Sequence, residues 1–272
     1  MSTLKSILLH MDASPEAAGR LRCALQLAKA HAAELTALYA VLPTYLQNPY
    51  AMAISADAAS AYQRFDDERA ARAKALFTAA APDTRWAEAA GEPVSAFTRQ
   101  AFYADLLVLS HSDPADMAST GVPADFIESV LIDSGTPALV LPRVPMPETL
   151  GRVALVAWKE TRESARALRA ALPILRKAER VEVAIWDDGT APAGGLLNIE
   201  SLLRNHGVTA RVHHHGKESA ELGEYLLSLT VDVSADLLVM GCYGHSRARE
   251  LVLGGATRTV LRSLTLPVLM AH

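Results

Sequence analysis

The sequence predicts an α/β fold built from two tandem doubly wound domains, each with a five-stranded parallel sheet flanked by helices. Two observations lead to this prediction. Short apolar runs alternate with helical patterns along the whole chain, which is typical of parallel strands that helices cover on both faces. The chain also repeats itself, because residues 104–109 (ADLLVL) return as residues 235–240 (ADLLVM). Self-similarity over about half the chain indicates two copies of one fold.

The second half displays the order of elements most clearly. Its first strand is a continuous apolar run, and Thr161 can cap the helix that follows it. The expected strands are 152–158, 181–186, 210–215, 236–241 and 267–271. The other expected helices are 199–206, 219–229 and 255–264.

The first half follows the same order. Ser14-Pro15 suits the cap and first turn of its first helix. Prolines and an asparagine predict a loop over 42–60, and the alanine-rich segment 61–81 predicts a helix. A proline-rich stretch at 143–148 marks the junction. We therefore expect domains at residues 1–145 and 150–272.

Composition excludes several classes of protein. The 272 residues carry a net charge of −4, which disfavours nucleic-acid binding because phosphate backbones need a clustered positive field. No apolar run reaches the roughly 18 residues of a membrane span, and the N-terminus lacks a signal-peptide layout. Cys23 and Cys242 stand in unlike contexts and build no disulfide framework. We expect a cytoplasmic protein without membrane contacts.

A glycine-punctuated loop follows the expected strand 236–241. Gly241 and Gly244 lie in this loop, and Gly254 and Gly255 open the next helix. Glycine lets backbone N–H groups approach a ligand, and helix N-termini carry unpaired donors. Ligands of doubly wound sheets bind at the carboxyl ends of strands, near the topological switch point. The pattern favours an anionic ligand such as a phosphate chain over the alternative, a plain strand-to-helix turn.

These residues resemble the universal stress protein family in its tandem two-domain bacterial form. The family pattern is Gly-x-x-Gly, nine residues, then Gly with Ser or Thr; Gly241, Gly244 and Gly254 keep this spacing, and Gly255 stands at the hydroxyl position. The resemblance implies strand order 3-2-1-4-5 and binding of ATP or another adenine nucleotide, with Mg²⁺ left open. ATP-binding members carry an acidic residue after the first strand. Asp12 matches it in the first half, and Lys159 stands there in the second.

The candidate binding residues cluster around the glycine loop and the end of the first strand of the second half. They are Met240, Gly241, Gly244, His245, Arg247, Gly254, Gly255, Ala256, Thr257 and Lys159. The Thr257 hydroxyl would add a donor to the helix amides, and Arg247 either meets phosphate or is solvated. Lys159 either contacts the nucleotide or is a surface lysine. The first half lacks the glycines, so we expect a degenerate site there with Asp12 as a turn residue.

Catalytic and metal signatures are weak. The sequence has no Walker motif, Gly-x-Ser-x-Gly elbow or His-Glu-x-x-His. Of the three consecutive histidines, only His213 and His215 share a strand face, and no third ligand is evident. We predict no catalytic residues and no metal site, and at most weak ATP hydrolysis.

The resulting hypothesis is a cytoplasmic universal stress protein that acts in the stress response as a nucleotide-responsive binding module for ATP or a related phosphorylated ligand. A slow ATPase or phosphotransferase and a ligand-free scaffold are the alternatives. The fifth strands, 138–141 and 268–271, offer edges. These edges would serve a homodimer or an intramolecular pseudo-dimer of the two halves, and a protein partner is also expected.

Overall fold

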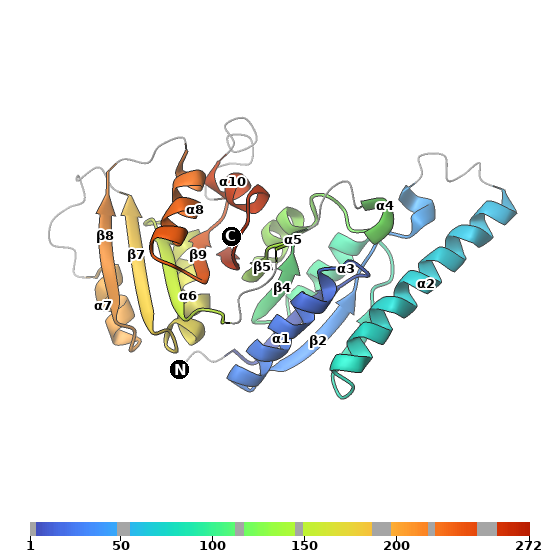
Figure 1. Ribbon diagram of the computed structural model, residues 1–272, viewed down its shortest axis with the longest axis horizontal. Coiled ribbons are helices and arrows are strands. Elements are labelled where there is room, and N and C mark those ends of the chain that lie inside the picture. The colour runs from blue at the N-terminus through green and yellow to red at the C-terminus, as the bar shows by residue number, and fades with distance from the viewer. Residues whose placement is uncertain are drawn as a thin grey trace. The chain divides into compact units, whose positions relative to one another are not determined.

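The computed structural model describes residues 4–47, 55–111, 117–144, 149–186, 197–216, 221–243 and 255–272. The chain divides into two compact units, Leu4–Thr136 and Pro137–His272, whose elements are drawn in Figure 1. Each has a mostly parallel sheet with flanking helices, which confirms the predicted fold class. Within these ranges no helix combines the length and the apolar character needed to cross a bilayer.

The first unit contains four parallel strands in the order β3-β2-β1-β4. The strands are β1 (Ser6–Met11), β2 (Glu34–Tyr39), β3 (Arg85–Glu88) and β4 (Leu106–Ser110). The helices are α1 (Ala17–His31), η1 (Thr44–Gln47), α2 (Ala56–Ala80), α3 (Pro93–Ala101), α4 (Met117–Thr120) and α5 (Phe126–Ser134).

Two local expectations for the first unit are wrong. Helix α2 begins at Ala56, five residues before the predicted start, because the Ser55 side chain caps it by accepting a hydrogen bond from Ala58 N. Ser14 does not cap α1, whose N-cap residue is Glu16. The Ser14 hydroxyl instead donates to Asp12. In both cases the serine side chain takes a nearby partner, a backbone N–H for Ser55 and the Asp12 carboxylate for Ser14.

The second unit contains the predicted five-stranded order. Its strands run β10-β9-β6-β7-β8, which is fifth, fourth, first, second, third in the repeat. The strands are β6 (Val153–Trp158), β7 (Arg180–Trp186), β8 (Ala210–His215), β9 (Leu237–Gly241) and β10 (Val268–Ala271). The helices are α6 (Arg162–Leu175), α7 (Ile199–Asn205), α8 (Leu222–Asp232) and α10 (Ala256–Arg262). Right-handed crossovers place α6 and α7 on one face and α8 and α10 on the other (Figure 1).

A strand from the first repeat completes this unit. Strand β5 (Ala138–Leu141) pairs antiparallel with β10, with Val140 opposite Val268 and Ala138 opposite Met270. Because β10 also pairs with β9, both of its edges are hydrogen-bonded. Of the two uses of these edges that the sequence left open, the pairing of the fifth strands within one chain is present.

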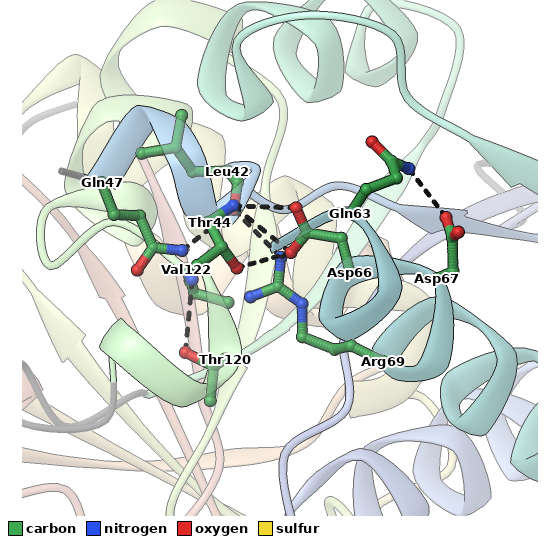
Figure 2. A network of polar contacts seen from close by, with 9 residues as sticks. All are labelled: Leu42, Thr44, Gln47, Gln63, Asp66, Asp67, Arg69, Thr120 and Val122. Carbon is green, nitrogen blue, oxygen red and sulfur yellow. Dashed lines mark hydrogen bonds and ion pairs between the residues drawn. The ribbon is translucent and has the colours of Figure 1, made fainter. Parts of the chain in front are cut away.

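A polar network in the first unit ties α2 to the segments that follow β2 and α4 (Figure 2). The Arg69 side chain is 1% exposed, and its Nη2 donates to Asp66 Oδ1 at 2.8 Å and to Leu42 O at 3.1 Å. Asp66 also accepts from Thr44 N and Oγ1. Gly121 has φ +72°, and a Cβ there would lie 2.6 Å from Arg69 Nη1. The buried Arg69–Asp66 ion pair therefore holds the segment after β2, and the hydrogen bond from Leu42 N to Gly121 O at 2.7 Å joins that segment to the one after α4.

Replacement of Asp66 by asparagine should cost about 3 kcal/mol of unfolding free energy, because it leaves a buried guanidinium without its counter-charge. Urea denaturation measures this. Asp67 is exposed on the same helix and accepts a hydrogen bond from the exposed Gln63, so Asp67→Asn is the matched control and should change stability by less than about 0.5 kcal/mol. Equal effects of the two substitutions would show that the ion pair does not hold the network.

Candidate functional site

The topological switch point of the second unit lies between β6 and β9. These strands are neighbours, with Ala157 level with Met240. The chain leaves β6 into α6 on one face of the sheet and leaves β9 toward α10 on the other. Lys159 follows β6, while Met240 and Gly241 end β9. Doubly wound sheets bind ligands beside this switch point, so we place the candidate ligand crevice at these residues.

Gly241 is where α6 comes closest to β9. A Cβ at this position would lie 2.6 Å from Ser164 N and 2.8 Å from Glu163 C, distances that no side chain tolerates. The missing side chain thus lets the first turn of α6 pack against the strand end. The sequence predicts a ligand role for Gly241, and the structure gives it a packing role as well.

The opening of α10 is joined to the segment that follows β9. Thr257 is 4% exposed, and its Oγ1 accepts from Tyr243 N at 3.3 Å. Tyr243 has φ +54°, a left-handed conformation that is uncommon outside glycine. Cys242 N donates to Ala271 O at 2.9 Å. The Thr257 hydroxyl, predicted to face a ligand, therefore has a partner within the protein.

The remaining candidates divide into described and undescribed residues. Gly255 is the N-cap of α10, and Ala256 is its first residue. Met240 is buried in β9 at 5% exposure. Gly244, His245, Arg247 and Gly254 lie outside the described residues.

The first turn of α6 brings a carboxylate to the crevice that the sequence did not single out. Glu163 is 3% exposed and pairs with Arg162. Burial raises the pKa of Glu163, but hydrogen bonds from Arg162, the backbone and Thr161 outweigh it and leave this pKa below its ordinary value. Thr161 caps the helix by accepting from Ser164 N, and its own N–H donates to Lys159 O. An acidic residue in an N-terminal helix turn was the available sequence signal.

An aromatic trio stands at the carboxyl ends of β7 and β8. The rings of Trp186 and His215 stack with centroids 5.0 Å apart and planes at 20°. Tyr225 of α8 meets Trp186 edge-on at 6.0 Å and 89°. Its hydroxyl lies 3.2 Å from His215 Nδ1. Burial, followed by electrostatic interaction with His213 and His214, lowers the pKa of His215.

The three consecutive histidines do not converge. His213 Nε2 lies 2.7 Å from Glu182 Oε2, whereas His215 joins the aromatic trio. Among the residues described, no group of three His, Cys, Asp or Glu side chains is placed to hold a metal ion. Sequence reasoning missed the trio because Trp186, His215 and Tyr225 come from three separate elements.

The equivalent edge of the first unit is occupied by its own side chains. Asp12 is 2% exposed, and Arg20 Nη2 lies 2.8 Å from its Oδ1. Ser14 donates to the same carboxylate through N and Oγ. Arg20 Nη1 also donates to Ser110, at the end of β4. The Asp12 carboxylate therefore makes its contacts within the protein, as expected of a residue that stabilises a turn.

His10 lies beside this ion pair and is 1% exposed. Its Nε2 donates to Ala40 O at 2.8 Å, and its ring contacts Phe126 and Phe97. Burial, helped by the charge of Arg20, lowers the pKa of His10 to about 4, against the opposing effects of Asp12 and the Ala40 bond. Burial raises the pKa of Asp12, but Arg20 reverses this and brings it to about 2.

Comparison with known proteins agrees with this architecture. A family model described as the universal stress protein family matches residues 3–130 and 151–272. A universal stress protein of Synechocystis is 48% identical over 46 residues, a match that spans 17% of this chain and 16% of that protein.

Solved structures resemble almost the whole chain. A universal stress protein from Archaeoglobus fulgidus has a TM-score of 0.71 at 17% identity, covering 98% of this chain and 96% of its own. A structure described as a putative universal stress protein from Pseudomonas aeruginosa has a TM-score of 0.58 at 16% identity, with 98% and 92% covered. At these identities the likeness shows the fold.

Substituting Gly241 by alanine should destabilise the protein by about 1–3 kcal/mol, because the new methyl group overlaps the backbone of α6. Gly216→Ala is the matched control, since a Cβ at Gly216 meets nothing within 4 Å. Urea unfolding of both variants measures the difference. If Gly241→Ala unfolds like the unsubstituted protein, the close approach does not constrain this position.

Stability should fall as pH drops from about 6.5 to 4, because unfolded His10 takes up a proton that the folded state excludes until its pKa of about 4. The slope approaches 1.4 kcal/mol per pH unit and the loss totals on the order of 3 kcal/mol. The depressed pKa of Asp12, about 2, extends the loss below pH 3.8.

Chemical denaturation at a series of pH values tests the role of His10. His10→Gln should flatten the dependence between pH 6.5 and 4. His214→Gln, at an exposed position of β8, should leave it intact. An unchanged slope in His10→Gln would assign the dependence to other groups.

Proposed function

Because this chain belongs to the universal stress protein family, we propose that its second unit binds ATP or a related phosphorylated ligand and acts as a nucleotide-responsive binding module. The observation that carries the proposal is the switch point between β6 and β9, where Gly241 lets the backbone of α6 pack against the end of β9. This is the place at which doubly wound sheets take ligands.

The ligand's phosphates would lie between the ends of β6 and β9 and the start of α10. Lys159 supplies a positive charge beside the crevice, and Gly255, Ala256 and Thr257 supply backbone amides. Glu163 carries a negative charge that Arg162 balances. The pairing matters because an unbalanced carboxylate would repel phosphate.

One nucleotide per chain is the proposed stoichiometry. In the first unit the corresponding edge is filled by the Asp12–Arg20 pair and by His10, all at most 2% exposed. A ligand there would have to break a buried ion pair, which costs several kcal/mol.

Hydrogen bonds lead from the site to the fifth-strand pair. Tyr243 N donates to Thr257 Oγ1, and Cys242 N donates to Ala271 O at the end of β10. His272 Nδ1 donates to Cys242 O at 3.3 Å. Strand β10 pairs in turn with β5. A ligand that favours one arrangement of the segment after β9 therefore shifts the population of conformers at this strand pair.

We extend the proposal to a role in the cytoplasmic stress response. Family membership is the support for this part, and the partner is a protein that distinguishes the nucleotide-bound from the nucleotide-free conformer.

Calorimetric titration with ATP should give one site per chain. If Kd is near 10 μM, about 1 mM ATP adds roughly 2.7 kcal/mol to stability and raises the melting temperature.

Lys159→Ala should weaken ATP binding about tenfold through loss of a charged contact. Lys74→Ala, at an exposed position of α2, is the control and should bind ATP unchanged.

A flat melting temperature and no adenine nucleotide released on denaturation, as read by mass spectrometry, would contradict the proposal and favour a scaffold. Metal-dependent release of phosphate from ATP would instead favour the slow ATPase. Nucleotide retained intact over hours supports a binding module.

A further inference from the structure

The aromatic trio lies at the same edge of the sheet as the proposed phosphate crevice. Trp158 is level with Ile185 in the β6–β7 register, and Lys159 and Trp186 are the residues that follow them. Ala157 is level with Met240 in the β6–β9 register, two residues before Lys159 and Cys242. Trp186, the end of β6 and the segment after Gly241 thus form one row across the strand ends.

The direction of the ring stack follows from its spacing. Trp186 and His215 are register partners on neighbouring strands. Their centroid separation of 5.0 Å matches the spacing of about 4.8 Å between adjacent strands. The rings therefore stand side by side along the hydrogen-bonding direction. His215 covers the Trp186 face on the β8 side, and the opposite face is turned toward the end of β6.

Other contacts fix the tryptophan in this orientation. Tyr225 packs edge-on against Trp186 and lies 5.6 Å from the His215 ring. Its hydroxyl lies within hydrogen-bond distance of His215 Nδ1, at 3.2 Å. His215 and Tyr225 are positioning residues in this arrangement, since both act on a ligand through Trp186.

We propose that the second unit reads the base of its ligand by stacking on Trp186, so that the ligand is a nucleotide and not a phosphorylated compound without an aromatic ring. The inference rests on the proposed function. From β7 to β9 is two strand spacings, about 10 Å, which suits a base over the end of β6 beside Trp186 and phosphates at the end of β9. Electron-rich indole rings stack on every base, so recognition of the ring class is expected.

The test compares two probes, ATP and inorganic tripolyphosphate, by calorimetric titration of the full chain. Trp186→Leu should weaken ATP binding roughly 5- to 150-fold, the range measured for loss of a base–aromatic stack. It should leave tripolyphosphate binding unchanged. Trp186→Phe keeps a stacking face and should restore most of the ATP affinity. Trp86→Leu, in β3 of the first unit, is the control and should bind both probes as the unsubstituted protein does. Circular dichroism checks that each variant is folded.

Failure of the inference is distinct from failure of the proposed function. If Trp186→Leu is folded and binds ATP with unchanged affinity, stacking on Trp186 is overturned while the nucleotide site stands. If both probes lose affinity equally in Trp186→Leu, the tryptophan acts through the phosphate site and the stacking proposal is again overturned. If the unsubstituted protein binds neither probe, the proposed function falls as well.

Discussion

The close approach between the first turn of α6 and the end of β9 is the constraint on which the second unit depends. It requires a residue without a side chain at Gly241, since a Cβ would meet Ser164 N at 2.6 Å. The approach brings Glu163 against the end of β9, and the Thr161 side chain caps the same turn of α6. The same backbone continues through Cys242 to a hydrogen bond with β10. Site and sheet are therefore built around one contact.

The two units use the same edge of a similar sheet in different ways. In the first, a buried cluster of Asp12, Arg20 and His10 satisfies its own charges. A second buried pair, Arg69 with Asp66, anchors the neighbouring segments. Such clusters are stable only when every charge is paired, which leaves no charge for a ligand. In the second unit, Lys159 follows the equivalent strand β6, and Gly241 ends the neighbouring strand β9. The aromatic trio stands at the ends of β7 and β8.

Much of the fold could be predicted from the sequence because apolar runs and the internal repeat are strong, local signals. The strand order of the second unit and the pairing of the fifth strands both agree with the structure. The hydrogen-bond partners of single serine hydroxyl groups could not be predicted. The Ser55 cap makes α2 begin earlier than the alanine-rich segment indicates. The Ser14 hydroxyl donates to Asp12 and does not cap α1. Several partners lie within reach of a serine, and only the folded backbone decides among them.

The candidate site shows the same division. The glycine spacing located the strand end and the start of α10, because glycine at a turn is a local property. Glu163, the partner of Thr257 and the trio around Trp186 depend on elements far apart in sequence, so no spacing rule could find them. The packing role of Gly241 belongs with these, since its neighbour is the backbone of α6.

Whether a fragment of the second half includes strand β5 decides whether the edge of β10 is covered. A fragment that begins near residue 150 would carry the complete second repeat by sequence but would lack the antiparallel neighbour of β10. Its outermost apolar strand would then present unpaired amides and carbonyls to other molecules, a template for self-association. A fragment that begins at Pro137 retains that cover, because the division between the two compact units lies upstream of the proline-rich junction.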